Sequence, residues 1–353
     1  MGAMFKEICS WQNLRIAYRK AARGKRGRQA AADFEYNLAD HLLELQDDLV
    51  NRTYQPGAYH SFIIHDPKRR LISAAPFRDR VVHHALCCKT EPIFERSFSS
   101  ASFANRVGKG THLALDRAQA LARRFQYVLQ FDVEQFFPAI DHRILRRILA
   151  RKIDDPEVLW LVDQILASGV GVLKDQYTLR SFPGDNPQDA LRPRGLPIGN
   201  LTSQFWANCY LNPFDHFVER ELRCRGYVRY VDDGLVFARE KRTLWKWREA
   251  IIKRLARLRL TIHPEAHPRP VSEGIPFLGF VVYPSHRRLK RRNVVNYRRR
   301  LKRLIAGWIC DECTREAVLE SLRGWINHAR YGDTWGLRKS ITAQLPNLHG
   351  GAS

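Results

Sequence analysis

The chain has 353 residues, with 59 Lys and Arg against 36 Asp and Glu and a formal net charge of +23. A hydrophobic fraction of 44% excludes a disordered chain, and no apolar run approaches the roughly 20 residues of a membrane-spanning helix. The first residues lack a signal-peptide pattern, so we expect a cytoplasmic protein that makes no membrane contact. This excess of cations attracts polyanions, which favours a nucleic-acid partner over a merely adhesive, ribosome-like protein.

Residues 1–55 are expected to form a basic N-terminal arm and a helix. Phe34, Leu38, Leu42, Leu45 and Leu49 recur at helical spacing, which predicts an amphipathic helix. The preceding stretch 19–28 is rich in cations, and we interpret it as an RNA-binding arm, with a solvated loop as the alternative. The arm residues are Lys20, Arg23, Lys25, Arg26 and Arg28.

The next segments alternate between extended and helical patterns. Residues 59–73 read as two extended pieces joined by a turn at 66–70, and helices are expected from about 79 to 94 and from about 111 to 125. A helical stretch near 141–167 precedes a polar, proline-rich excursion. A short helix then runs from Leu201 to Asn212, where Pro213 is expected to stop it.

The last third is more basic. After an apolar hairpin at 229–237 we expect a basic helix at 241–258, a strand at 277–282 and basic helices from 287 to 343. Cys310 and Cys313 have the spacing of half a zinc site, but no second Cys/His pair completes it, so helix packing is the favoured interpretation. Mixed strands and helices followed by a helical portion predict an α+β core with a helical appendage.

Three acidic residues carry the chemical signal. Asp132 ends the apolar run 127–131, and Asp232 and Asp233 lie inside the apolar hairpin. If the three carboxylates converge above a rigid sheet, they can hold two Mg²⁺ ions, or Mn²⁺ as a substitute, because hard cations prefer oxygen ligands. The alternative for Asp233-Gly234 is ordinary turn chemistry.

Two motifs resemble those of reverse transcriptases. Residues 130–137, Gln-Phe-Asp-Val-Glu-Gln-Phe-Phe, resemble the first catalytic block, and Tyr230-Val-Asp-Asp233 resembles the second. The resemblance implies a right-hand polymerase in which Asp132 and Asp232 bind both metals, Asp233 supports them, and Val133 offers a backbone group to the triphosphate. It also implies fingers at 56–126 with part of 170–197, a ferredoxin-like palm at 127–284, a helical thumb at 285–345, and a tail at 346–353.

The same resemblance implies further contacts. Lys68-Arg69-Arg70 looks like a triphosphate-binding block, in which either arginine is the direct contact, and Phe137 would wall the sugar pocket unless it is simply core. The other nucleotide-binding candidates are Ile198, Gly199 and Gln204. The nucleic-acid-binding candidates are Arg78, Arg80, Arg106 and Lys109 for the template, Phe277, Leu278 and Gly279 for the primer grip, and Arg298, Arg299 and Lys302 in the thumb.

One block departs from most reverse transcriptases. The form Ile198-Gly-Asn-Leu-Thr-Ser-Gln204 resembles the enzymes of diversity-generating retroelements, which belong to the group II intron-like reverse transcriptases. That resemblance implies error-prone, adenine-mutagenic cDNA synthesis from a structured template-repeat RNA. Its partners would be the RNA/DNA hybrid, dNTPs and a basic pentameric accessory variability protein. The alternatives are a retron, defence or CRISPR-associated reverse transcriptase, or a non-catalytic RNA-binding scaffold.

Two departures from the family pattern yield hypotheses. At the place of Ile198, most reverse transcriptases have a glutamine, which would hydrogen-bond the sugar and hold the nascent pair. Ile198 has no donor or acceptor, so Ile198→Gln is expected to lower the error rate. The alternative is that Ile198 merely packs under the template base. His267 falls near the place of a proton-donating lysine, either as a general acid for pyrophosphate or as an ordinary loop residue.

Overall fold

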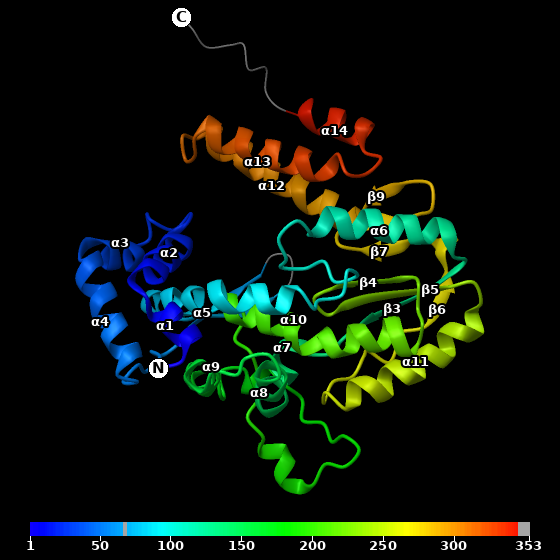
Figure 1. Cartoon of the computed structure of the whole chain (residues 1–353). Helices are drawn as coiled ribbons and strands as arrows, with labels where there is room; N and C mark the ends of the chain where they lie inside the picture. The colour runs from blue at the N-terminus through cyan, green and yellow to red at the C-terminus, as the bar shows by residue number, and fades with distance from the viewer. Residues whose placement is uncertain (66–68, 345–353) are drawn as a thin grey trace, which may run out of the picture.

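The computed structural model describes residues 1–65 and 69–344. The Lys68 of the expected triphosphate block, most of the expected turn at 66–70, and the expected tail 346–353 lie outside these residues. Figure 1 shows an N-terminal helical layer beside a central sheet, with the last three helices above the sheet. The mixture of helix and sheet agrees with the expected α+β class.

Four helices form the N-terminal layer: α1 (Ala3–Cys9), α2 (Trp11–Ala22), α3 (Gln29–Tyr36) and α4 (Leu38–Val50). The single amphipathic helix expected through 34–49 was wrong, because Asn37 leaves helical geometry at φ −115°, ψ 48° and separates α3 from α4. Asn competes for backbone hydrogen bonds and favours such boundaries. The break lets the Phe34 ring stack on Tyr18, 6.0 Å between centroids, while Leu42 faces the same core.

A hairpin and two helices follow. β1 (His60–Ile64) pairs antiparallel with β2 (Arg70–Ala74), and both match the expected extended pieces. α5 (Phe77–Glu95) packs against α2 and α10, and α6 (Thr111–Arg124) lies against the sheet. Both helices agree with the helical spacing of the sequence.

The central sheet has the strand order β4-β5-β3-β6, with every pair antiparallel: β3 (Tyr127–Asp132), β4 (Tyr227–Tyr230), β5 (Asp233–Ala238) and β6 (Pro268–Pro270). Successive side chains point to opposite faces. Accordingly, Val128 packs with α6 and β7, whereas Leu129 and Phe131 pack with α10 and α11. Helices therefore cover both faces, while the Asp132 side chain at the end of β3 is 47% exposed.

The helices between β3 and β4, and the one after β5, cover the lower face in Figure 1. They are α7 (Phe136–Ala139), α8 (His142–Ala150), α9 (Pro156–Ser168), α10 (Leu201–His216) and α11 (Lys241–Ala256). The helical stretch expected at 141–167 is thus two helices. The polar excursion holds only two short 3₁₀ turns, Lys174–Gln176 and Pro187–Leu191.

The expected stop at Pro213 was wrong. α10 continues through Pro213 to His216 and runs on into a π-helical turn at Phe217–Glu221. Tyr210, Leu211 and Phe214 around the proline are fully buried. Their packing outweighs the single backbone hydrogen bond that proline removes, which is how tertiary context overrides helix propensity.

The strand expected at 277–282 was also wrong, because it is a hairpin of β7 (Ile275–Phe277) and β8 (Phe280–Val282). Leu278 (φ 45°) and Gly279 (φ 88°) form its two-residue turn, and left-handed backbone at both positions suits the twist of a tight hairpin. A further 3₁₀ turn, Val271–Glu273, precedes it, and β9 (Arg287–Leu289) completes the small sheet. The basic helices follow as expected: α12 (Arg291–Ile309), α13 (Arg315–Ala329) and α14 (Trp335–Thr342).

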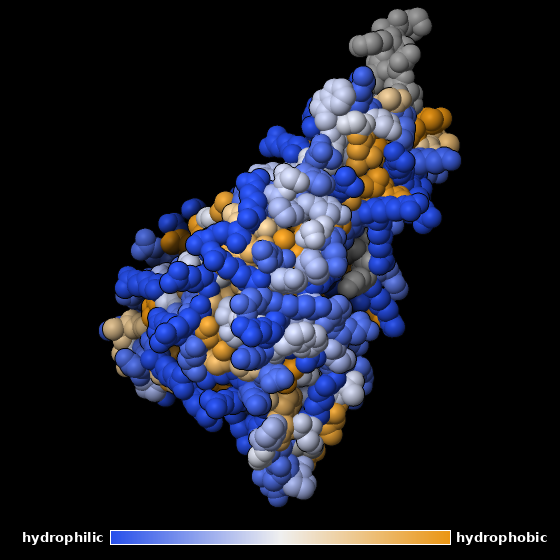
Figure 2. Space-filling model, turned by 90° about the vertical axis from the view of Figure 1, so that its right-hand side faces the viewer, coloured by the Kyte–Doolittle hydropathy of each residue, from blue (hydrophilic) through white to orange (hydrophobic). Residues whose placement is uncertain are grey.

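Two features of the surface bear on function. Hydrophilic residues dominate the face in Figure 2, in keeping with the net charge of +23. Across residues 1–65 and 69–344, no helix combines the length and apolarity needed to cross a membrane. The Cys313 Sγ donates to the Leu304 carbonyl at 3.3 Å and packs against the core of the last helices, as expected, whereas Cys310 is exposed and the packing interpretation is wrong for it.

Candidate active site

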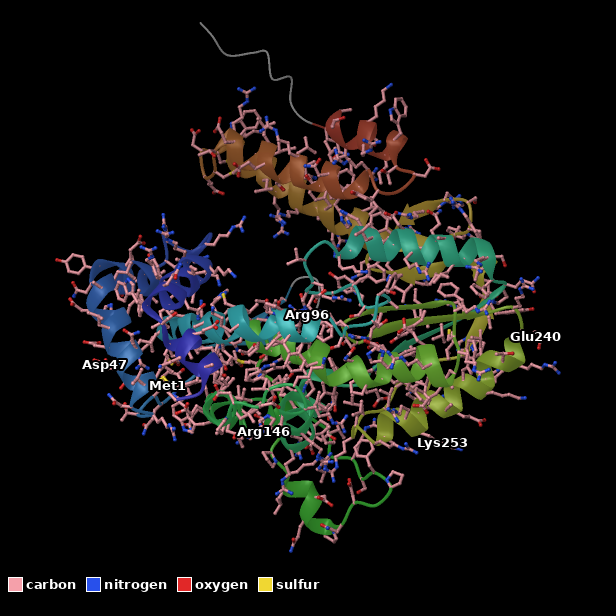
Figure 3. All side chains as sticks on the ribbon, in the orientation of Figure 1. Met1, Asp47, Arg96, Arg146, Glu240 and Lys253 are labelled. Carbon is pink, nitrogen blue, oxygen red and sulfur yellow. The ribbon has the colours of Figure 1, made fainter. Side chains whose placement is uncertain are left out.

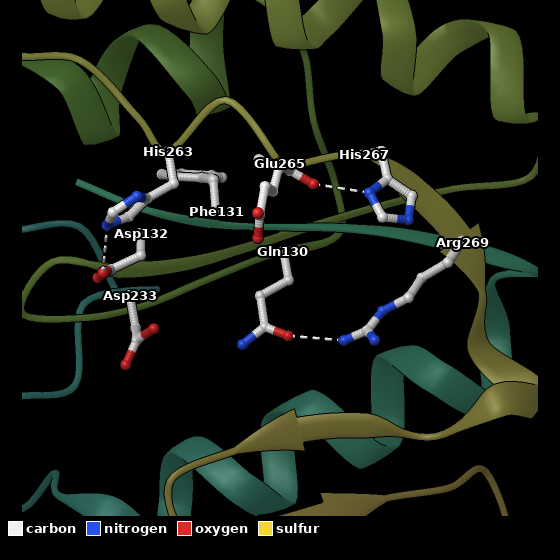
Figure 4. Close-up of a pocket in the computed structure, with 9 residues that line it drawn as sticks. Gln130, Phe131, Asp132, Asp233, His263, Glu265, His267 and Arg269 are labelled. Atoms are coloured by element: carbon white, nitrogen blue, oxygen red, sulfur yellow. Dashed lines mark hydrogen bonds and ion pairs between the residues drawn. The ribbon is translucent and has the colours of Figure 1, made fainter. Parts of the chain in front are cut away.

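The geometry of two strand ends brings the three aspartates together. Asp132 and Asp233 are cross-strand partners of β3 and β5, and Tyr230 pairs with Asp233, so Val231 and Asp232 form the turn between β4 and β5. The Val133 N–H donates to the Asp232 carbonyl at 3.3 Å, which ties the turn to the end of β3. Figure 4 shows the Asp132 and Asp233 side chains on the same side of this edge.

The dipeptide Asp233-Gly234 is not the turn, so that alternative reading was wrong. Gly234 lies within β5 opposite Phe131. A Cβ at Gly234 would fall 2.1 Å from the Phe131 ring, so only glycine leaves room for that buried side chain. Gly234 therefore allows β3 and β5 to pack closely next to the Asp132–Asp233 pair.

The pKa of Asp232, in the turn between β4 and β5, shows that the carboxylates interact electrostatically. Burial, and next the negative charge of Asp132, raise the pKa of Asp232 to about 6, while the charges of Arg70 and Arg229 act in the opposite direction. Like charges that oppose ionisation in this way attract a divalent cation. In the part of the chain that the structure describes, however, no group of three or more His, Cys, Asp or Glu is arranged to hold a metal ion. The donor set has the chemistry of a magnesium site, without its closed arrangement.

A cavity of about 250 Å³ opens beside the carboxylates and is lined by Gln130, Phe131, Asp132, Asp233, His263, Glu265, Ala266, His267 and Arg269. His263, which the sequence did not single out, lies nearest to them: its Nε2 is 3.7 Å from Asp132 Oδ2 and its Nδ1 is 3.5 Å from Glu134 Oε1. The expected candidate His267 lines the same cavity, but its Nδ1 lies 2.6 Å from the Glu265 carbonyl oxygen. The bridge between Val133 and Ile262 places His263 beside β3, a pairing that sequence spacing does not reveal.

The candidates for nucleotide binding lie around this edge. Arg70 begins β2 and is exposed. Its positive charge acts to lower the pKa of Asp232. Arg69, also exposed, precedes the strand. The Phe137 ring is half-buried, 5.4 Å from the Phe136 ring, and its backbone carbonyl accepts from the Leu196 N–H at 2.9 Å.

The block 198–204 is tied to β2. The Ile198 carbonyl accepts from the Ser73 N–H at 2.8 Å, and the buried Asn200 amide bonds the Ser73 carbonyl and the Ala75 N–H. Ser203 Oγ donates to the Pro197 carbonyl at 2.7 Å. Gly199 has φ +119°, and Gln204 is exposed on the first turn of α10. These bonds attach the block that contains Ile198 to β2, the strand that begins with Arg70.

Two expected template contacts are occupied by protein. Arg106 donates to Glu95 and to the carbonyls of Ser99 and Ser102, and its side chain is 7% exposed. Lys109 donates to the Ser100 carbonyl at 2.9 Å. These contacts give both residues a packing role in the segment before α6.

The other expected nucleic-acid contacts divide by exposure. Arg78 pairs with Asp48, and Arg80 donates to the Ala75 carbonyl at 2.8 Å. Phe277 is buried, with Leu278 and Gly279 at the hairpin turn beside it. The exposed cations are Arg298, Arg299 and Lys302 on α12, and Lys20, Arg23, Lys25, Arg26 and Arg28 of the N-terminal arm.

Comparison with known proteins decides the family. The model of the reverse transcriptase (RNA-dependent DNA polymerase) family matches residues 64–282, which is more than half of the chain and includes Asp132, Asp232 and Asp233. The chain belongs to the reverse transcriptase family. It is 26% identical over 229 residues to protein YkfC of Escherichia coli, covering 61% of this chain and 56% of that protein.

The group II intron-encoded protein LtrA of Lactococcus lactis is 25% identical over 182 residues, which cover 51% of this chain and 28% of LtrA. The nuclear intron maturase 1 of Arabidopsis thaliana is 24% identical over 195 residues, covering 44% of this chain and 27% of the maturase. The chain thus spans little more than half of YkfC and about a quarter of the other two.

Proposed function

We propose that this reverse transcriptase is an active RNA-directed DNA polymerase that adds deoxynucleotides to a primer on an RNA template. The observation that carries the proposal is the meeting of Asp132, Asp232 and Asp233 at one sheet edge. The charge of Arg70 also acts to lower the pKa of Asp232. A charge of +23 suits the polyanionic template and product.

The architecture supports a right-hand polymerase. In chain order, helices separate β3 from β4 and β5 from β6, while β4 and β5 form a hairpin, and the spatial order β4-β5-β3-β6 is that of a ferredoxin-like βαββαβ sheet. We assign 127–284 to the palm, 56–126 with part of 170–197 to the fingers, 285–345 to the thumb and 1–55 to a basic N-terminal arm.

In this mechanism, Asp132 and Asp232 would hold two Mg²⁺ ions, with Asp233 as support, and the bound ions supply charge stabilisation to the reacting oxygens. Asp232 must be ionised for this, which its raised pKa resists and a nearby cation favours. Arg70 would bind the incoming triphosphate through charge-assisted hydrogen bonds. Val133 lies beside Asp232 and its N–H donates to the Asp232 carbonyl. The backbone group that Val133 would offer to the metal-bound triphosphate is therefore its carbonyl.

Phe137 would select the sugar. Its half-buried ring is held from one side by Phe136 and by its backbone bond to Leu196. A Phe137 ring held in place by close packing would clash with a ribose 2′-hydroxyl, because a packed side chain cannot move aside without disturbing its neighbours. Deoxynucleotides would therefore be preferred over ribonucleotides.

We further propose a role in a diversity-generating retroelement, making adenine-mutagenic cDNA from a template-repeat RNA with the help of a basic pentameric accessory protein. This rests on the block Ile198–Gln204, in which Ile198 is anchored to β2 by its carbonyl and has no polar side-chain group for the nascent base pair. A retron, defence or CRISPR-associated lineage is the alternative within the same family.

Primer extension on a defined RNA, followed by sequencing of the product, tests both levels of the proposal. We expect Mg²⁺-dependent extension with dNTPs, weak extension with NTPs, and errors concentrated opposite adenine. Asp232→Asn should abolish extension, while Asp163→Asn, on the distant α9, should not. Equal activity of wild type and Asp232→Asn would contradict the polymerase proposal and favour an RNA-binding scaffold. Errors spread evenly over the four template bases would contradict only the retroelement role.

A further inference from the structure

A buried arginine lies directly beneath the turn that carries Asp232. Arg229 is 1% exposed, and its guanidinium makes a two-pronged pair with Asp215, Nε to Oδ1 at 2.7 Å and Nη2 to Oδ2 at 2.6 Å. Its Nη1 donates to Asn208 Oδ1 at 3.2 Å and to the Val231 carbonyl at 2.9 Å. One side chain thus connects helix α10 with the first residue of the turn.

The acceptor at the turn is strained. Val231 has φ +57°, a left-handed conformation that β-branched residues rarely adopt. Such a conformation persists only where its surroundings hold it. The Arg229 bond to the Val231 carbonyl supplies such a hold one residue before Asp232.

The network below the arginine fixes its direction. Asp215 is fully buried and also accepts from the Tyr227 hydroxyl at 2.7 Å. Tyr227 and Arg229 lie two apart on β4 and so face the same way, towards Asn208 and Asp215, two turns apart on α10. A buried ion pair stabilises a fold no better, in general, than apolar packing of the same volume. Its directed contact with the turn is the property that an apolar pair would lack.

Resting on the proposed polymerase function, we propose that Arg229 is a positioning residue, locked by Asp215, that sets the turn at Val231 and thereby the place of the Asp232 carboxylate. Ser203 lies in the first turn of the same α10 and donates to the carbonyl of Pro197, next to Ile198, which is bonded to β2. One helix therefore aligns the carboxylate side and the triphosphate side of the site.

The test compares Arg229→Met/Asp215→Leu with wild type. This double variant replaces the ion pair by apolar side chains, so the core stays packed but the bond to Val231 is lost. We expect a folded protein with a lowered melting temperature, because the buried Tyr227 hydroxyl loses its acceptor, together with a kcat lowered about 100-fold and an apparent Mg²⁺ requirement raised about tenfold. The KM for dNTP should change by less than about threefold.

Two further variants keep the test decisive. Arg229→Lys retains the charge but not the fork, so it should fold and fall between wild type and the double variant. Arg146→Met/Asp163→Leu removes an Arg–Asp pair of 2.6 Å between α8 and α9, at the distant lower side in Figure 3, and should leave kcat and the Mg²⁺ requirement unchanged. A folded Arg229→Met/Asp215→Leu with wild-type kcat and Mg²⁺ requirement would overturn the proposal, and so would wild-type values in Arg229→Lys if the double variant does not fold.

Binding of Mn²⁺, followed by electron paramagnetic resonance without primer or dNTP, separates this proposal from the polymerase function. We expect the Arg229 variants to bind Mn²⁺ about tenfold more weakly than wild type. Equal Mn²⁺ affinity in the wild type and a folded Arg229 variant would overturn the positioning role. Mn²⁺ binding that depends on Arg229 in a protein without primer extension would support the positioning role and overturn only the proposed function.

Discussion

At the scale of the residue, the main feature of the site is that Asp232 is a partly buried carboxyl whose proposed function requires a negative charge. Asp232 occupies a turn where burial and Asp132 both oppose its ionisation, with Arg70 and Arg229 as the opposing cations. A carboxylate held in this way is poised for a divalent cation, because the ion removes the repulsion that the fold maintains. In the absence of metal, the ionised Asp232 therefore lowers the free energy of unfolding.

Asp232→Asn should stabilise the metal-free protein. A carboxyl whose pKa is raised to about 6 binds its proton more tightly in the folded chain, so its penalty is absent below about pH 4 and develops as pH rises through about 6. At pH 7.5 in EDTA, we expect the variant to gain about 1–3 kcal/mol over wild type. Thermal unfolding of both proteins at pH 4.5 and 7.5 measures the difference. A difference that shrinks at the higher pH would contradict this account of Asp232.

Arg70 and Arg69 should differ in effect. The charge of Arg70 acts to lower the pKa of Asp232, which favours Arg70 over Arg69 as the residue that contacts the triphosphate. Arg70→Ala should raise the KM for dNTP about tenfold to a hundredfold, as expected for loss of a charge-assisted contact. Arg69→Ala is the matched control, with a smaller change. Steady-state kinetics in which Arg69→Ala has the larger effect would reverse the assignment.

Ile198→Gln tests the origin of infidelity. The new amide adds a donor and an acceptor beside the nascent pair, and the backbone bond of residue 198 to Ser73 is unaffected. We expect fewer errors opposite adenine, with discrimination improved by about 1–3 kcal/mol. Ile198→Leu, which adds no polar group, should keep the wild-type spectrum. The hypothesis fails if product sequencing finds the same spectrum for Ile198→Gln.

At the scale of the element, tight hairpins place the functional groups. The turn of Val231 and Asp232 carries a carboxylate, and the turn of Leu278 and Gly279 joins β7 to β8. The Gly279 carbonyl accepts from the Lys290 N–H at 3.0 Å, immediately before α12. The second turn thereby fixes the start of the basic helices relative to the small sheet of β7, β8 and β9.

Gly279→Val should loosen this connection. The residue has φ +88°, and a Cβ there would lie 3.1 Å from the Asn293 side chain. We expect a loss of about 1–3 kcal/mol in stability and a raised KM for primer–template. Gly324→Ala on α13, where the space around a Cβ is open, should be neutral or slightly stabilising. Chemical denaturation and primer titration check both, and a neutral Gly279→Val would argue against a fixed turn.

The elements also show what can be predicted from sequence. Apolar runs ending in Asp132 and Asp232 identified the strands and the carboxylates, because buried strands and strand-end acids leave local patterns. The continuation of α10 through Pro213 depends on packing between distant segments, and so does the approach of His263 to Asp132. Likewise, nothing local distinguishes Arg106, which packs against Glu95, from an arginine that binds nucleic acid.

At the scale of the whole molecule, charge governs affinity for nucleic acid. Among the described residues of α12, Arg298, Arg299 and Lys302 are exposed, and the neighbouring Arg299 and Arg300 line a cleft of about 540 Å³ that also includes His65 at the end of β1. A nucleic-acid strand bound between the basic helices and the β1–β2 hairpin would release the counterions of its phosphates.

Replacing Arg298, Arg299 and Lys302 by Gln should weaken the salt dependence of RNA/DNA binding. With three phosphate contacts removed, the slope of log K against log salt should fall in magnitude by about 2–3. The matched control replaces Lys241, Lys246 and Lys253, exposed cations on α11 at the lower right of Figure 3, and should keep the slope. Equal slopes for the two variants would mean that net charge alone, and not this helix, binds the duplex.

The most direct test of the central claim is a crystal structure of the protein with Mn²⁺, an RNA template, a 3′-dideoxy primer and the next dNTP. The anomalous signal should reveal two ions about 3.5–4 Å apart, both bound by Asp132 and Asp232, with the primer end beside them. Anomalous peaks elsewhere, or an Asp132 side chain turned away from the ions and the primer, would contradict the account.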